Sequence, residues 1–491
     1  MMNPLGLNDP TLFVQQAYIG GRWTDASGCQ TLNVDNPYSG AIIGSVPDCG
    51  RDDTSEAIAA ADLALRNWRA RPAAERAALL ERWHALIIDN APDLARIMTA
   101  EQGKPLAEAE GEVRYGASFV KWFAEEARRI CGFTVPAPTA DRRIMMMKEA
   151  VGVTAAITPW NFPNAMITRK AAPALAAGCT IVVKPSELTP FSALALAVLA
   201  ERAGLPEGVI SVVTGRPEAI GAMLTESATV RKISFTGSTR VGAMLMQQSS
   251  ATLKRLSLEL GGNAPFIVFD DADIELAVSG VIASKFRNAG QTCICANRIL
   301  VQDEIYDRFA TRLVEAVGKL RTGDGLVAGS TIGPLINAAA VAKVRVHVSD
   351  ALGKGGTLLT PADADKGGGR IVSPVIVGNA TTAMLLANEE TFGPVAPLFR
   401  FQAESEAIHI ANATPYGLAA YFYTRDLNRS WRVAEQLEFG MVGLNTGSIS
   451  MEVAPFGGVK QSGIGREGGA LGIEEYLEVK SFHIAGLDAV Y

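Results

Sequence analysis

Strands and helices alternate along the middle of this chain, and that alternation limits the folds open to it. VGVTAAITPW predicts a strand running into a loop, and ITRKAAPALAAG predicts a helix that stops at Gly178. TIVVKPSE predicts a buried strand, FSALALAVLAERAG a helix that stops at Gly204, and VISVVTG and KISFTGS two more strands. This order predicts an α/β fold with a parallel sheet covered by helices, the architecture of nucleotide-binding domains.

The rest of the chain predicts further domains, because 491 residues are too many for one small core. Residues 18–46 predict short strands, and residues 54–127 carry apolar residues at helical spacing. A second alternating block starts near Pro265, so we place the domain change at Gly261-Gly262, where the backbone is freest.

Residues 133–150 predict a hairpin with a polar turn at Asp141 and an apolar strand over Met145–Met147. Two interpretations fit this segment: an arm that needs a partner surface, or an ordinary surface hairpin.

Composition excludes several classes of partner. The net charge is -6 and no basic block stands out, which argues against nucleic acid and anionic membranes as partners. No apolar run approaches the roughly 18–20 residues that span a bilayer. The N-terminus lacks a basic segment followed by an apolar one, and six cysteines do not make a disulfide scaffold. We therefore expect a reduced, cytoplasmic compartment.

Two strand-end loops suit a dinucleotide. In KISFTGSTRVG, Gly237 makes a turn and Ser238 can cap a helix that begins near Val241, so free backbone N–H groups face a phosphate. In VVKPSE, Lys184 and Glu187 can grip the hydroxyls of a ribose, and the acid repels a 2′-phosphate, which favours NAD over NADP. An ordinary capped turn and solvated loop charges are the alternatives.

Two more loops offer catalytic groups. Asn161, in the proline-bounded loop TPWNFP, is a neutral donor suited to a developing oxyanion, or it simply forms a turn. Glu259 ends an apolar strand, so its pKa should be raised and it can serve as a general base. Alternatively, Glu259 pairs with a nearby lysine or arginine.

The stretch GQTCIC offers a thiol nucleophile, Cys293 or Cys295. A zinc site normally uses four ligands, and the chain has only four histidines, none near this stretch, so we expect no metal. The same scarcity of histidine indicates that any base for the cysteine is a carboxylate.

Seven motifs together carry a resemblance to a known family. TPWNFP, KPSE, FTGSTRVG, LELGGNAP, GQTCICANR, EETFGPV and PFGGVKQSGIGRE stand in the order found in NAD(P)-dependent aldehyde dehydrogenases. The resemblance runs from YIGGRW to the end of the chain. It implies oxidation of an aldehyde through a cysteine thiohemiacetal and a thioester.

The resemblance implies roles for individual residues. Cys293 is similar to the nucleophile, Asn161 and the Cys293 N–H to the oxyanion hole, and Glu259 to the base that activates water. Lys170 and Glu467 are similar to residues that assist proton transfer. The positions similar to cofactor contacts are Trp160, Lys184, Ser186, Glu187, Gly237, Ser238, Glu390 and Phe392.

The fold that the resemblance implies has three parts. Residues 1–132 and 151–260 form a Rossmann-type NAD-binding domain, and residues 261–470 form an α/β catalytic domain. Residues 133–150 and 471–491 form a β-arm and tail for oligomerisation, because members of the family are dimers or tetramers.

Three side chains near the cysteine suggest the substrate. Arg169, Arg287 and Ser450 can bind the far carboxylate of a dicarboxylic semialdehyde, since arginine offers a permanently charged fork. Alternatively, either arginine pairs with an internal acid. These positions and the C-x-C spacing resemble family members that oxidise succinate semialdehyde. Glutarate semialdehyde and related carboxy-aldehydes are rivals, because one methylene changes discrimination by only about 1–3 kcal/mol.

Three further hypotheses stay open. The chain can be a catalytically silent protein that keeps the fold, although the set Cys293, Glu259 and Asn161 argues against this. It can be a CoA-acylating member, although Glu259 would then have no use. Finally, Cys295 can act as a redox switch by forming a disulfide with a low-pKa thiolate at Cys293, or it can be a small buried side chain.

Overall fold

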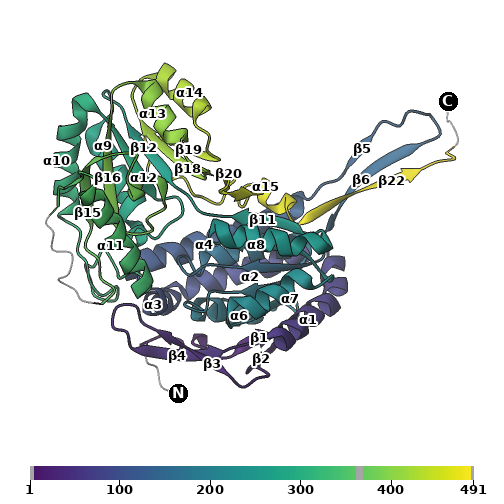
Figure 1. Cartoon of the computed structure of the whole chain (residues 1–491). Helices are drawn as coiled ribbons and strands as arrows, with labels where there is room; N and C mark the ends of the chain where they lie inside the picture. Colours follow the sequence, from purple (N-terminus) through teal and green to yellow (C-terminus); the bar gives the residue numbers. More distant parts are fainter. Residues whose placement is uncertain (1–4, 361–368, 488–491) are drawn as a thin grey trace.

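The computed structural model describes residues 5–360 and 369–487. Figure 1 shows two α/β lobes, one in purple to teal and one in green, and a long arm that projects away from both. None of the helices in the described part is both long and apolar enough to cross a membrane. The predicted domains include residues 1–4, 361–368 and 488–491, which lie outside the described residues.

The first lobe contains an eight-stranded sheet in the order β2-β1-β9-β8-β7-β10-β11-β21. Its five central strands are parallel, which confirms the sheet expected from the alternating pattern: β7 (Val153–Ile157), β8 (Thr180–Lys184), β9 (Ile210–Val212), β10 (Val230–Thr236) and β11 (Arg255–Glu259). The remaining strands pair antiparallel at the two edges: β1 (Ala17–Ile19), β2 (Arg22–Thr24) and β21 (Gly463–Ile464). The central strands read as apolar runs because helices cover both faces of the sheet (Figure 1).

Eight of the longer helices in the described residues belong to this lobe, and the first four fill the segment whose apolar spacing predicted helix. They are α1 (Arg51–Ala70), α2 (Ala73–Asp89), α3 (Ala91–Gln102), α4 (Leu106–Glu126), α5 (Ala165–Ala177), α6 (Phe191–Arg202), α7 (Pro217–Glu226) and α8 (Thr239–Ser249). Gly178 ends α5 at φ 96°, a left-handed conformation that glycine adopts without strain. α4 packs against both α2 and α5, so a helix distant in sequence lies beside the start of α5.

The second lobe contains a seven-stranded sheet in the order β14-β15-β16-β13-β12-β18-β19. Its strands are β12 (Ala264–Val268), β13 (Ala296–Gln302), β14 (Thr357–Leu358), β15 (Val375–Ala380), β16 (Val395–Phe401), β18 (Ala419–Tyr423) and β19 (Met441–Leu444). Its helices are α9 (Ile274–Val281), α10 (Tyr306–Val317), α11 (Ala338–Gly353), α12 (Leu385–Asn388), α13 (Glu404–Asn412) and α14 (Leu427–Gln436). β12 is the first strand of this sheet in sequence order and begins just after Gly261-Gly262.

The arm consists of β5 (Phe133–Val135), β6 (Arg143–Ala150) and β22 (Leu477–Ile484), and Figure 1 shows it projecting from the first lobe. β6 pairs antiparallel with β22 from Ala150↔Leu477 to Arg143↔Ile484. The chain therefore brings the predicted hairpin together with the C-terminal segment. The remaining elements are short: β3 (Thr31–Asp35), β4 (Ile42–Pro47), β17 (Tyr416–Gly417), β20 (Val459–Lys460) and α15 (Leu471–Glu474).

Candidate active site

Loops that follow the parallel strands of the first sheet meet the loop that carries Cys293. Asn161 follows β7, Gly237 and Ser238 follow β10, and Glu259 is the last residue of β11. The carboxyl ends of neighbouring parallel strands share one edge of a sheet, so residues far apart in sequence converge there. Asn161, Gly237 and Ser238 line one cavity with Cys293.

This first cavity, the cofactor-side cavity, has a volume of about 400 Å³. It is lined by five of the predicted cofactor positions: Trp160, Gly237, Ser238, Glu390 and Phe392. The rings of Trp160 and Phe392 meet edge to face at 5.6 Å, and burial raises the pKa of Glu390 to about 7. Ser238 caps α8 by accepting a hydrogen bond from the Val241 N–H, so a positive helix end faces the cavity.

The other predicted cofactor residues, Lys184, Ser186 and Glu187, do not line this cavity. They lie at the carboxyl end of β8, where Lys184 Nζ is 3.0 Å from Glu187 Oε2. Burial lowers the pKa of Lys184, and the neighbouring Glu187 acts in the opposite direction. Lys184 and Glu187 therefore form an ion pair at the same edge of the sheet, outside the cofactor-side cavity.

The segment before Cys293 has an unusual backbone. A π-helical turn over Ile282–Phe286 leads into Asn288 and Ala289, which have φ values of 51° and 54°. Non-glycine residues with positive φ are uncommon and cluster at functional sites. On the other side, a Cβ on Gly262 would lie 2.2 Å from the Cys293 carbonyl oxygen, so only glycine allows the two loops this close.

The thiol of Cys293 does not have the low pKa that we expected. Desolvation raises the pKa of Cys293 to about 12, and the charges of Glu390 and Glu259 act in the same direction. Arg169 acts in the opposite direction but does not outweigh burial. The expectation was wrong because the sequence did not reveal how closely the surrounding loops enclose the sulfur.

Asn161 links its own loop to the cysteine loop. Its Nδ2 donates to the carbonyl oxygen of Gln291 at 3.0 Å, two residues before Cys293. A side-chain amide has two N–H donors, so one remains for a ligand. Asn161 is 5% exposed and lines the cofactor-side cavity beside Cys293.

Glu259 lies in a buried charged group together with Arg169, Lys170 and Glu467. Lys170 Nζ is 2.6 Å from Glu467 Oε1, and Arg169 Nη2 is 2.9 Å from Glu467 Oε2. Although burial opposes it, Lys170 and Arg169 hold the pKa of Glu467 below its usual value. Burial, and next the charge of Glu467, raise the pKa of Glu259 well above its usual value, as the sequence predicted.

A small second cavity, the reaction cavity, contains all three predicted substrate residues. It measures about 20 Å³ and is lined by Tyr115, Phe162, Met166, Arg169, Arg287, Thr292, Cys293, Ile294, Ser450 and Phe456. Cys293 lines both this cavity and the cofactor-side cavity, so this residue lies where the two meet.

The two arginines differ in their partners. Arg169 pairs with Glu467, as the alternative interpretation of the sequence had it, although it also lines the reaction cavity. Arg287 stacks on Phe162 at 4.8 Å, and no carboxylate among residues 5–360 and 369–487 lies within ion-pair distance of its guanidinium. Arg287 is therefore the cation with the freer hydrogen-bond donors.

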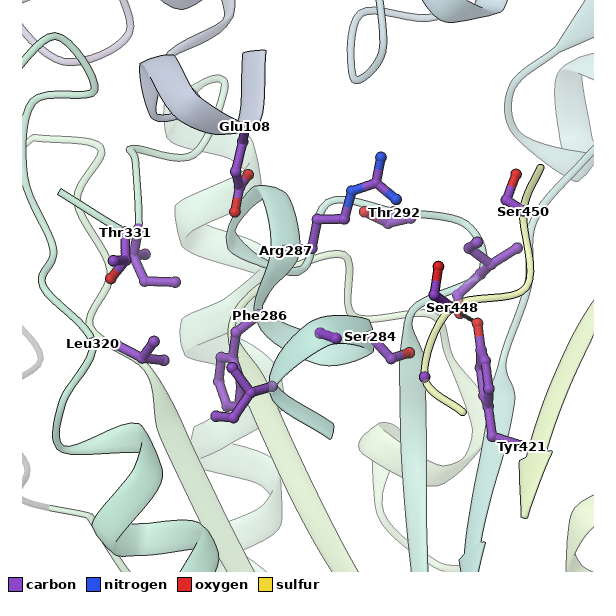
Figure 2. A pocket seen from close by; sticks show the side chains of 15 residues that line it. Glu108, Ser284, Phe286, Arg287, Thr292, Leu320, Thr331, Tyr421, Ser448 and Ser450 are labelled. Atoms are coloured by element: carbon purple, nitrogen blue, oxygen red, sulfur yellow. Dashed lines mark hydrogen bonds between the residues drawn. The ribbon is translucent and has the colours of Figure 1, made fainter. Parts of the chain in front are cut away.

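A third cavity of about 440 Å³ adjoins the reaction cavity and shares Arg287, Thr292, Ile294 and Ser450 with it. Figure 2 shows Arg287 between Glu108 on one side and Ser448 and Ser450 on the other. The shared residues give a ligand a path to Cys293 that is separate from the cofactor side.

Cys295 lies apart from these cavities. It is 6% exposed, and its Sγ donates weakly to the carbonyl oxygen of Lys285 at 3.6 Å. All six cysteines of the chain are free. The redox-switch hypothesis stays a prediction.

Sequence analysis missed Tyr115 and Lys343. The Tyr115 hydroxyl forms a hydrogen bond with Ser450 Oγ, and Lys343 lines the cofactor-side cavity and donates to the carbonyl oxygen of Glu390. Both lie on helices, α4 and α11, whose apolar spacing predicts burial but does not indicate which polar residue faces a site.

Comparisons with known proteins point the same way. The sequence profile of the Aldehyde dehydrogenase family matches residues 23–482. The chain is 58% identical over 481 residues to the glutarate-semialdehyde dehydrogenase of Pseudomonas aeruginosa (strain PAO1), covering 98% of this chain and 100% of the relative. It is 59% identical to the NADP(+) succinate-semialdehyde dehydrogenase GabD of Escherichia coli (strain K12), covering 96% and 98%.

A solved structure agrees with the fold. The succinate-semialdehyde dehydrogenase from Burkholderia pseudomallei is 58% identical, with a TM-score of 0.97 over 98% of this chain and 100% of that chain.

Proposed function

This chain belongs to the aldehyde dehydrogenase family, and from that premise we propose that it oxidises a carboxy-aldehyde, with succinate semialdehyde as the favoured substrate. The product is the dicarboxylate, and the enzyme is an NAD(P)-dependent oxidoreductase. The observation that carries the proposal is the reaction cavity, where Arg287, Arg169 and Ser450 lie with Cys293.

The side chains that line the reaction cavity support a carboxy-aldehyde as the substrate. Arg287 has free donors and Ser450 has a hydroxyl, which together suit a carboxylate at the far end of a four- or five-carbon chain. The aldehyde carbon then lies at Cys293. A neutral aldehyde gains no attraction from the Arg287 charge, so the site favours a substrate with an anionic end.

The residues of the cofactor-side cavity fit a nicotinamide dinucleotide. The capped N-terminus of α8 suits a phosphate, Trp160 and Phe392 offer ring faces and edges, and Glu390 offers a carboxylate to a ribose. When bound, the dinucleotide accepts a hydride from the aldehyde carbon. Glu187 supports NAD over NADP because its charge repels a 2′-phosphate, although the Escherichia coli relative is named for NADP.

Acylation begins at the Cys293 sulfur. The Cys293 thiol releases its proton to solvent, and the thiolate attacks the aldehyde carbon, which places negative charge on the aldehyde oxygen. The free Nδ2–H of Asn161 and the backbone N–H of Cys293 stabilise that oxygen. Loss of the hydride from the same carbon leaves a thioester on Cys293.

Deacylation uses Glu259 as the base. The ionised carboxylate takes a proton from a water molecule, whose oxygen attacks the thioester carbon and expels the Cys293 sulfur. Glu467 and Lys170, joined at 2.6 Å, lie beside Glu259 and can carry the proton away. The acid product then leaves through the path that passes Arg287.

Glutarate semialdehyde is the second candidate, because a relative that is 58% identical is named for it. A panel of succinate semialdehyde, glutarate semialdehyde and butanal, each with NAD and with NADP, tests the proposal. We expect the highest kcat/KM for succinate semialdehyde with NAD. If kcat/KM for butanal equals that for succinate semialdehyde, the proposed carboxylate site is contradicted. If kcat/KM is higher for glutarate semialdehyde, that compound becomes the favoured substrate.

The same panel addresses the remaining alternatives. A catalytically silent protein would produce no NADH with any aldehyde, and a CoA-acylating enzyme would depend on added CoA. Exposed apolar side chains on the arm, Phe133, Val479 and Phe482, support a homodimer or homotetramer. The free state of all six cysteines supports a reducing, cytoplasmic compartment.

A further inference from the structure

A buried ion pair lies behind the oxyanion loop and has no part in the steps above. Lys104 follows α3, Glu112 lies in α4, and Lys104 Nζ contacts Glu112 Oε2 with both side chains 0% exposed. A buried ion pair is weak evidence for stability, because the desolvation of two charges offsets much of their attraction. Its position therefore calls for a reason other than stability.

Lys104 holds the peptide of Asn161. Its Nζ donates to the Asn161 carbonyl oxygen at 2.7 Å, and the ammonium lies 4.1 Å from the ring centre of Phe162. Asn288 Nδ2 donates to the same oxygen at 2.9 Å. In the described part of the chain, this oxygen has no backbone donor, so two side chains alone satisfy it.

Glu112 holds the start of α5. Its Oε1 accepts from the backbone N–H groups of Asn164 at 3.0 Å and Ala165 at 3.2 Å. The Asn164 side chain does not cap the helix, so Glu112 takes that role. A carboxylate is also favoured at the positive end of a helix. α5 carries both Arg169 and Lys170.

The helix that carries Glu112 approaches α5 closely. A Cβ on Gly116, one turn after Glu112, would lie 2.3 Å from Asn164 Oδ1. Packing at a glycine fixes the separation of the two helices. The ion pair is thus attached to a rigid support on one side and to the loop 161–164 on the other.

We propose that Lys104 and Glu112 are positioning residues that fix the amide of Asn161 for oxyanion binding. This inference rests on the proposed role of Asn161. The Asn161 loop has irregular structure, and its side chain reaches the Gln291 carbonyl only if the Asn161 backbone is held in place. A displacement of about 1 Å in a catalytic group can lower the rate by roughly 100-fold.

The test is the double variant K104M/E112Q, which removes both charges and nearly preserves shape. The amide oxygen that E112Q introduces can still accept from the two backbone N–H groups of α5, so the main loss is the donor to Asn161. We expect the rate of NADH formation in the first turnover, measured by stopped flow, to fall at least tenfold. The Kd for NAD should stay within twofold, because the cofactor-side residues are unchanged.

The variant N161A shows whether the effect passes through the amide. If it does, K104M/E112Q/N161A is no slower than N161A, because the amide to be positioned is already gone. If the slowing caused by K104M/E112Q multiplies with the slowing caused by N161A in the triple variant, the inference is overturned. A first turnover of K104M/E112Q within twofold of the parent would also overturn it. A parent-like first turnover in N161A would instead refute the proposed oxyanion role itself.

Two further variants distinguish a positioning effect from a folding defect. N288G removes the second donor to the Asn161 oxygen, leaves the ion pair intact and suits the φ of 51°. We expect it also to slow the first turnover, and a rate within twofold of the parent would count against the inference. E101Q is the control, because Glu101 is another buried acid that accepts from the backbone N–H groups of Phe191 and Ser192 at a helix start, and E101Q should not slow the first turnover.

Discussion

Arg169 Nη2 lies 2.9 Å from Glu467 Oε2, so one of the two arginines of the reaction cavity is already held by a carboxylate of the protein. Arg287, the other arginine, has no such partner among the described residues. We therefore expect different roles for the two arginines. In the proposed function, Arg287 provides most of the attraction for a substrate carboxylate, and Arg169 mainly supports the buried group around Glu259.

Replacement of Arg287 by alanine should weaken the binding of carboxy-aldehydes much more than the binding of neutral aldehydes. A hydrogen bond to a charged group contributes about 1.5–3 kcal/mol, so the KM for succinate semialdehyde should rise by roughly 10- to 150-fold. The KM for butanal should change by less than threefold. Steady-state kinetics on both substrates measure this, and equal increases would remove the carboxylate-binding role of Arg287.

Desolvation raises the pKa of Cys293 to about 12, and this predicts a distinctive pH dependence. Only the thiolate reacts with iodoacetamide, and at every pH below the pKa its fraction rises tenfold per pH unit. The rate of Cys293 alkylation, measured as the rate at which activity is lost, should therefore keep rising from pH 7 to pH 10. A short unstructured peptide with one cysteine, whose pKa is about 8.5, is the control and should level off above about pH 9.5. A plateau for the protein below pH 9 would show a lower pKa than the structure indicates.

The variant E259Q should separate the two halves of the reaction. In the proposed mechanism Glu259 acts only in deacylation, so one equivalent of NADH should form rapidly at each active site before turnover stalls. Loss of a general base lowers the steady-state rate by about 10²- to 10⁴-fold. In the parent, the raised pKa of Glu259 means that the carboxylate fraction, and with it deacylation, increases as the pH rises. Loss of the rapid first turnover in E259Q would place Glu259 in acylation instead.

The variant E187Q should shift cofactor preference toward NADP. It removes the charge that repels a 2′-phosphate and releases Lys184, whose Nζ is 3.0 Å from Glu187. We expect the ratio of kcat/KM for NADP to that for NAD to rise at least tenfold, which is about 1.4 kcal/mol. E218Q is the matched control, because Glu218 acts on Lys184 only at longer range. An unchanged ratio in E187Q would mean that other residues set the preference.

The sequence predicted the site best where strands end. Asn161, Ser238 and Glu259 follow or end parallel strands, and the edge they share is a consequence of topology that the alternating pattern already indicates. Tyr115, Lys104 and Glu112 come from helices or their ends, where burial of a polar residue depends on the neighbouring helix and not on the local pattern.

The same distinction explains why the expectation of a low pKa for Cys293 was wrong. The sequence indicates which charges stand near the sulfur in the chain, but desolvation depends on how closely separate loops approach. Gly262 brings one of those loops against the cysteine backbone, and nothing in the spacing of the motif shows how closely they pack.

Replacement of Cys295 by alanine tests the redox switch. Peroxide oxidises the thiolate form of Cys293 to a sulfenic acid with release of hydroxide, and the Cys295 thiol can then displace water to form a disulfide. The ring closed by a C-x-C disulfide is small, so dithiothreitol should reduce it readily.

In the parent, dithiothreitol should restore activity after peroxide. In C295A the sulfenic acid has no thiol beside it and proceeds to irreversible forms, so recovery should be largely lost. C49A, which removes another buried thiol, is the control. Equal recovery in C295A and the parent would leave Cys295 as a small buried side chain.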